Sequence, residues 1–156
     1  MVVDETYLTP VVAGKHWRGG AMSKVIEGGC LCGAVRYRIQ GEPLVTGTCQ
    51  CRTCRKASAA AIVLWSYVNA GDFAFTAGKP VEYNSSPSVT RTFCGRCGTP
   101  LTNWRAEYGP TIHVTTCSFD DPDASPPVAH CWTSHQLHWV KLTDGLPCFE
   151  EGPPSS

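Results

Sequence analysis

The sequence predicts a mainly β protein whose fold is organised by clusters of cysteine. Apolar and polar residues alternate with a period of two in several short segments, as in half-buried strands. Fifteen glycines and twelve prolines separate these segments and favour turns. Seven of the ten cysteines fall into three tight groups. The 156 residues suit one domain with a core of its own.

The strands can be placed in chain order from this alternation. The first contains Val35, Tyr37 and Ile39, which alternate with two arginines. Further strand-forming segments follow at 62–65, 73–75, 89–93 and 112–115. In the last of these, Ile112 and Val114 alternate with His113 and Thr115. A single helical turn is expected at 57–61, so helix content is low.

Composition excludes several function classes. Thirteen basic and thirteen acidic residues give a net charge of zero, so no nucleic-acid partner and no anionic membrane surface is expected. The longest apolar run, residues 59–65, is far shorter than the roughly 18 residues of a membrane-spanning helix. The N-terminus is acidic where a secretory signal is basic. A cytoplasmic location is therefore expected, where cysteines bind metals more often than they form disulfides.

The expected organisation is a single domain at 23–149. Residues 1–22 lack a sustained apolar period, and we expect a disordered N-terminal extension there, either native or upstream of a true start at Met22. Residues 150–156 are polar and rich in proline, which favours a disordered tail.

The cysteine groups have the spacing of metal ligands. They comprise Cys30 and Cys32, then Cys49, Cys51 and Cys54, then Cys94 and Cys97. Both Cys-x-Cys and Cys-x-x-Cys can direct two thiolates at one ion. Seven ligands divide into a closed site of four and an open site of three, the numbers that structural and catalytic zinc require. An iron–sulfur centre is the alternative metal. The trio could also complete a second structural site with Cys117, Cys131 or a histidine.

These motifs resemble the glutathione-dependent formaldehyde-activating enzyme family, whose domain is shared with centromere protein V. The resemblance rests on Gly29 to Tyr37, Cys49 to Arg55 and Phe93 to Leu101, and on a C-terminal pattern from Pro127 to Phe149. It implies an Mss4-like fold of coiled antiparallel sheets. It also implies two zinc ions, one structural on Cys30, Cys32, Cys94 and Cys97 and one catalytic on Cys49, Cys51 and Cys54. Gln50 departs from the pattern, since many relatives carry histidine there.

An open site of three thiolates suits thiol chemistry. Three negative ligands make zinc a poor Lewis acid for water, whereas a substrate thiol loses its proton on coordination. We therefore expect a carbon–sulfur lyase that acts on adducts of a thiol with a small aldehyde. The resemblance implies glutathione and formaldehyde as the partners. The alternative is a zinc-stabilised module that binds thiols or proteins without turnover.

Basic residues near the open site favour an anionic thiol. Residues 30–56 carry five cations against Glu42 alone, whereas residues 120–156 carry six acids against Lys141. Arg52 and Arg55 flank the trio and are the candidate substrate-binding residues. Arg36 and Arg38 are expected on the solvent face of a strand. The histidines and the isolated Cys117, Cys131 and Cys148 are expected to pack, and no general base is assigned.

Overall fold

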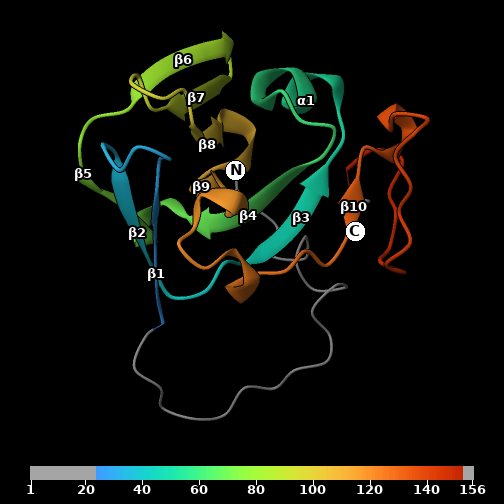
Figure 1. The fold of residues 1–156 in the computed structure, drawn as a ribbon, viewed down its shortest axis with the longest axis horizontal. Coiled ribbons are helices and arrows are strands. Elements are labelled where there is room, and N and C mark those ends of the chain that lie inside the picture. Colours follow the sequence, from blue (N-terminus) through green and yellow to red (C-terminus); the bar gives the residue numbers. More distant parts are fainter. Residues whose placement is uncertain (1–23, 153–156) are drawn as a thin grey trace.

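The computed structural model describes residues 24–152, which form two β-sheets and one short α-helix (Figure 1). The smaller sheet has the order β1-β2-β5, with β1 at Val25–Gly29, β2 at Arg36–Gln40 and β5 at Phe73–Ala77. The larger sheet has the order β10-β3-β4-β9-β8-β7-β6. Its strands are, in chain order, β3 (Val45–Cys49), β4 (Val63–Asn69), β6 (Val81–Ser86), β7 (Val89–Phe93), β8 (Pro100–Arg105), β9 (Thr111–Thr115) and β10 (His130–Cys131). The prediction of a mainly β fold is confirmed.

Neighbouring strands are antiparallel except at one edge, where β10 lies parallel to β3. Helix α1 spans Arg52–Ser58 and directly follows β3. Five turns of 3₁₀ helix join the remaining elements: η2 (Ala70–Asp72), η3 (Ala106–Tyr108), η4 (Thr116–Ser118), η5 (Pro122–Ala124) and η6 (Thr133–His135). No helix of the described residues is long and apolar enough to span a membrane.

The larger sheet carries a different apolar cluster on each face. Val68, Leu101 and Val114 pack with Tyr37 and Ile39 of the smaller sheet, and all five are at most 1% exposed. Trp65 is three residues before Val68 and points to the opposite face, where Cys54 of α1 packs against it. The smaller sheet therefore covers one face of the larger sheet, and α1 contacts the other.

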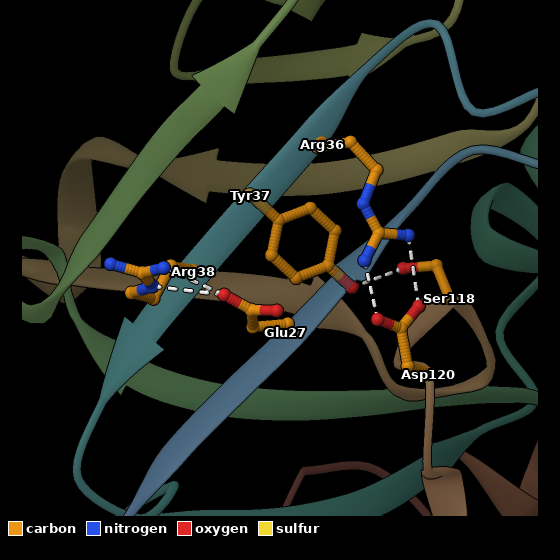
Figure 2. A network of polar contacts seen from close by, with 6 residues as sticks. All are labelled: Glu27, Arg36, Tyr37, Arg38, Ser118 and Asp120. Carbon is orange, nitrogen blue, oxygen red and sulfur yellow. Dashed lines mark hydrogen bonds and ion pairs between the residues drawn. The ribbon is translucent and has the colours of Figure 1, made fainter.

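One ion pair and a hydroxyl contact tie the smaller sheet to the η4 region, and a second ion pair joins β1 to β2 (Figure 2). Arg36 pairs with Asp120 through both terminal nitrogens, and the Arg38 Nη2 lies 2.8 Å from Glu27. The buried Tyr37 hydroxyl lies 2.6 Å from that of Ser118. Arg36 and Arg38 thus have partners at the strand surface and lie apart from the cysteine trio in the fold.

The structure corrects two local expectations. The helix spans Arg52–Ser58 rather than the expected 57–61. It begins at Arg52 because the Cys51 side chain caps its N-terminus, and it ends before Ala59 because Ala59 adopts a left-handed conformation. Strand β9 is central in its sheet and has cover on both faces, so His113 and Thr115 are buried although they alternate with apolar residues. The strand-forming segments of the sequence correspond to β2, β4, β5, β7 and β9. Strands β1, β3, β6, β8 and β10 were not among the predicted elements.

The expected N-terminal extension at 1–22 lies outside the described residues, as do the last four residues of the expected tail at 150–156. Of the remaining tail residues, Glu150 and Glu151 accept backbone hydrogen bonds from Ser134 and Trp132, at 3.2 and 2.8 Å. The start of this segment is therefore joined to η6.

Candidate metal centres

Four cysteines from distant parts of the chain converge between the two sheets. Cys30 and Cys32 lie in the turn from β1 to β2, and Cys94 and Cys97 lie in the turn from β7 to β8. All four Sγ atoms lie within 4.8 Å of one another. Cys30 and Cys94 are 5% and 1% exposed and belong to the main apolar core. This cluster, called the four-cysteine cluster below, joins the smaller sheet to the larger one.

Two tight turns hold these thiols in place. In each turn the backbone N–H of a glycine bonds back to a cysteine carbonyl, Gly33 to Cys30 at 2.9 Å and Gly98 to Cys94 at 2.8 Å. Both glycines have positive φ, 71° and 75°, a conformation that residues with a Cβ disfavour. The glycine that follows each cysteine pair is therefore needed for the turn.

Hydrogen-bond donors lie close to the sulfur atoms of this cluster. The backbone N–H of Val35 donates to Cys30 Sγ at 3.2 Å, and that of Arg96 donates to Cys94 Sγ at 3.4 Å. The hydroxyl and backbone N–H of Thr99 lower the pKa of Cys97 to about 5. Since a metal binds the thiolate rather than the thiol, these donors prepare the cluster for a cation.

The other three cysteines form a local cluster where β3 passes into α1. Cys49 ends β3, Cys51 is the helix N-cap and Cys54 lies in the first turn of α1. Their Sγ atoms lie within 4.8 Å of one another, and no fourth cysteine, histidine or carboxylate of the described residues joins them at that distance. We call this group the three-cysteine cluster. It spans six residues of chain, whereas the other cluster spans 68.

Contacts with the other two thiols, assisted by a capping hydrogen bond, favour negative charge on one thiol of the trio. The backbone N–H of Cys54 donates to Cys51 Sγ at 3.3 Å. Contacts with Cys49 and Cys54 lower the pKa of Cys51, while the contact with Cys51 raises the pKa of Cys49. Three thiols so close cannot all ionise without a cation between them.

Both clusters have a donor set that fits a metal ion. None of the ten cysteines, all within the described residues, forms a disulfide. Thiolates select zinc, copper(I) or iron–sulfur centres over the hard cations magnesium and calcium. Each cluster could therefore hold a soft or borderline metal ion, with four protein ligands in one and three in the other.

An open cavity of about 700 Å³ lies beside the three-cysteine cluster, between α1 and the strands β6, β7 and β8. Arg52 and Lys56 line it from α1, Arg91 from β7, and Trp65 from β4. Trp65 also packs directly against Cys54, so the cavity is adjacent to the trio. No acidic side chain of residues 24–152 lines this cavity.

The two arginines predicted to bind substrate have different positions. Arg52 is exposed and lines the cavity together with Lys56, one helical turn further on. Arg55 is not among the lining residues, and its Nε is buried with no hydrogen-bond partner among the described residues. The cavity residues Arg91, Trp65 and Tyr83 were not predicted from the sequence. They come from three different strands, and no local motif marks them.

The histidines have different environments. His130 is 3% exposed and fully partnered, with Thr48 Oγ1 at 2.8 Å and Asp144 at 3.0 Å, as expected of a packing residue. His113 is 2% exposed and contacts the rings of Tyr67 and Tyr108, and within the described part of the chain its Nε2 has no hydrogen-bond partner. Burial, together with the nearby charges of Arg105 and Arg91, lowers the pKa of His113 to about 3. It is neutral at physiological pH.

The isolated cysteines and Gln50 lie outside both clusters. Cys117 and Cys148 are exposed, so they are not the buried packing residues expected from the sequence. Cys131 is half-buried and pairs in register with Cys49 across β10 and β3. Gln50 is fully buried, and both its side-chain polar atoms lack partners among the described residues.

Comparison with known proteins agrees with these clusters. The model of the glutathione-dependent formaldehyde-activating enzyme family matches residues 25–135, which include all seven clustered cysteines. A Halomonas elongata protein provisionally named as such an enzyme is 25% identical over 128 residues, covering 76% of this chain and 81% of that protein. A crystal structure of a Rhodobacter sphaeroides protein is similar to this chain, with a TM-score of 0.53 and 19% sequence identity. The match covers 79% of this chain and 98% of that chain, and it shows a shared fold. Since the family model covers most of the chain, the protein belongs to the glutathione-dependent formaldehyde-activating enzyme family.

Proposed function

We propose that the protein is a zinc-dependent carbon–sulfur lyase that acts on the adduct of glutathione, or a related thiol, with formaldehyde or another small aldehyde. The observation that carries this proposal is the difference in ligand number between the clusters: four thiols in one, three in the other. Zinc with four protein ligands is structural, whereas zinc with three retains a position for substrate. The family name supports glutathione and formaldehyde as substrates.

The proposed metal sites follow from this difference. Cys30, Cys32, Cys94 and Cys97 would hold a structural zinc, and Cys49, Cys51 and Cys54 a catalytic one. A zinc ion on the trio would supply a coordination position at which a substrate thiol loses its proton. The rest of the proposal concerns the residues around that position. The fold would be of the Mss4-like type, and thiol ligands suit the reducing cytoplasm.

The reaction is a reversible addition. The sulfur of the thiol forms a bond to the carbonyl carbon of the aldehyde, the carbonyl π bond breaks, and the proton lost by the thiol ends on the oxygen. The product is an S-hydroxymethyl thioether, and the reverse reaction cleaves the same carbon–sulfur bond. The protein brings the reactants together and keeps the sulfur deprotonated.

Three features of the chain assist this chemistry. Trp65, Tyr67 and Val63 pack around the trio and exclude water from one side of it. Burial raises the pKa of Tyr67, whose hydroxyl therefore remains a hydrogen-bond donor at all physiological pH values. The cations Arg52, Lys56 and Arg91 offset the excess negative charge of three thiolates.

Exchange spectroscopy tests the proposal directly. Protein purified without added zinc should contain two zinc ions per chain, and it should accelerate exchange between free and hydroxymethylated glutathione, measured by NMR, above the buffer rate. X-ray absorption should show a change in zinc–sulfur coordination when glutathione is added. Exchange at the buffer rate, with no change in coordination at saturating glutathione, would leave only a zinc-stabilised module.

A further inference from the structure

One row of side chains crosses the larger sheet from the three-cysteine cluster to the cavity. Tyr67 pairs with His113, His113 with Asn103, Asn103 with Arg91, and Arg91 with Tyr83, across the strands β4, β9, β8, β7 and β6 (Figure 1). Residues directly opposite each other on neighbouring strands point to the same face. These five residues, called the polar row below, therefore share one face of the sheet.

The polar row lies on the face that carries the trio. Trp65 is two residues before Tyr67 on β4 and so points to the same side. Both pack with the three cysteines in one cluster. At the other end of the row, Tyr83 and Arg91 line the cavity together with Arg52 and Lys56 of α1. The row thus extends from the thiol site to the cavity.

Several polar atoms on this face are buried without a partner. Trp65 Nε1, Asn103 Oδ1 and His113 Nε2 have no hydrogen-bond partner among the described residues, and these side chains are only 3%, 5% and 2% exposed. An unsatisfied buried polar group costs about 1 to 3 kcal/mol. Such groups are rare in native proteins, and a water, an ion or a ligand can supply the missing bonds. Trp65 Nε1 is a donor beside the trio, Asn103 Oδ1 is an acceptor further along the row, and His113 Nε2 donates or accepts according to its tautomer. Such a set fits a ligand that has amide groups.

The cavity is also a site for anions. Arg52, Lys56 and Arg91 take part in none of the ion pairs found among the described residues. The Nε of Arg91 donates to Ser85 Oγ at 3.2 Å, which fixes the side chain while its terminal nitrogens make no bond to a carboxylate. The guanidinium fork matches a carboxylate better than a lysine does.

We infer, on the basis of the proposed function, that this face binds the carboxylate- and amide-bearing body of the thiol substrate, with Arg91 as the specificity-determining residue. The thiol end lies toward the three-cysteine cluster, and the carboxylates lie on Arg91, Arg52 and Lys56. A cavity of about 700 Å³ is of the size that small-molecule sites have. Small neutral thiols, which offer no carboxylate to Arg91, should therefore be poor ligands.

Binding of S-methylglutathione tests this inference, because its blocked sulfur cannot lose a proton at the trio. Calorimetry on the zinc-loaded wild type should give binding of S-methylglutathione at least tenfold tighter than that of its diethyl ester, whose carboxylates are neutralised. Arg91→Gln should weaken binding of the acid at least tenfold and leave that of the ester unchanged. Arg91→Lys should restore binding only in part, since it keeps the charge and loses the fork.

Arg38→Gln is the matched control, because Arg38 is an exposed arginine of the smaller sheet that pairs with Glu27. This variant should bind S-methylglutathione as the wild type does. The inference would be overturned if the wild type bound the acid and the ester with equal affinity, or if the Arg91 and Arg38 variants lost equal affinity for the acid. The comparison of acid with ester uses the wild type alone, so it does not depend on the folding of a variant. Tight, Arg91-dependent binding without exchange catalysis would instead refute the lyase activity and leave the anion site in place.

Discussion

The two cysteine clusters use the same ligand in opposite structural settings. The four-cysteine cluster draws its ligands from turns 62 residues apart, and two of its thiols are part of the main core. The three-cysteine cluster is contained in one strand end and one helical turn, and it forms a small core of its own beside the cavity. A metal that joins distant segments stabilises the fold, whereas one held by adjacent residues is free to serve chemistry.

The largest effect should come from breaking the four-cysteine cluster. Cys97→Ser removes one ligand, and structural zinc contributes about 10 to 16 kcal/mol of binding free energy, as much as the whole stability of an ordinary domain. We expect the variant to unfold or aggregate, measured by zinc content and thermal melting. Cys148→Ser, an exposed cysteine outside both clusters, is the control and should melt as the wild type does. A native melting curve and full zinc content in Cys97→Ser would contradict the assignment.

Breaking the three-cysteine cluster should separate activity from folding. Cys54→Ser leaves the long-range cluster intact, so the expected cost is about 1 to 3 kcal/mol for one buried polar group. Zinc content should fall from two ions to one, and hydroxymethyl exchange should fall to the buffer rate. Denaturant unfolding and metal analysis on the same sample measure both quantities. If this variant unfolds as completely as Cys97→Ser, the two clusters are both structural and the comparison fails.

The sequence indicates which cysteines gather in each cluster, and it reveals little of the cavity. Within each cysteine group, neighbouring members are separated by only one or two other residues, so local spacing reveals them. Arg91 reaches the three-cysteine side only through pairing of β7 with β8 and of β8 with β9, which depends on tertiary contacts. Arg55 lies one helical turn from Arg52, yet the cavity lining includes Arg52 and Lys56 and not Arg55. Its role in substrate binding stays a prediction.

Acid should affect the three-cysteine side through His113 as well as through the thiols. The pKa of His113 is about 3 in the folded protein against 6.5 for an unperturbed histidine. Between these values the unfolded chain binds the additional proton, so stability falls as pH decreases from about 6.5 to about 3, by at most about 1.4 kcal/mol per pH unit. His113→Phe removes this contribution and keeps an aromatic ring between Tyr67 and Tyr108.

Urea unfolding of both proteins between pH 4 and 8 measures the difference. Acid also protonates the cysteines, but that effect is common to the two proteins and cancels in the comparison. We expect the free energy of unfolding of the wild type to fall more steeply below pH 6.5 than that of His113→Phe. Parallel curves would show that His113 titrates alike in the folded and unfolded states.

The smallest effects should come from the backbone next to each cluster, where two left-handed residues differ in kind. Gly98 follows the four-cysteine cluster with φ of 75°, and Ala59 ends α1 after the three-cysteine cluster with φ of 50°. A residue with a Cβ loses about 1 to 2 kcal/mol in this conformation, whereas glycine does not. Gly98→Ala should therefore destabilise the protein by about 1 kcal/mol, although no atom of the described residues lies within 4 Å of the added Cβ.

Ala59→Gly should do the opposite. The Ala59 N–H already bonds to the Arg55 carbonyl as a helix C-cap, and glycine is the residue that this position favours. The gain is about 0.5 to 1 kcal/mol, because part of the relief is offset by the greater freedom of glycine in the unfolded chain. Chemical denaturation measures both variants. Ala59 thus carries backbone strain beside the three-cysteine cluster, whereas Gly98 avoids such strain beside the four-cysteine cluster. This difference fits a three-cysteine site where local stability matters less than the position of α1 over the cavity. Equal losses of stability in both variants would show that the two turns are under the same constraint.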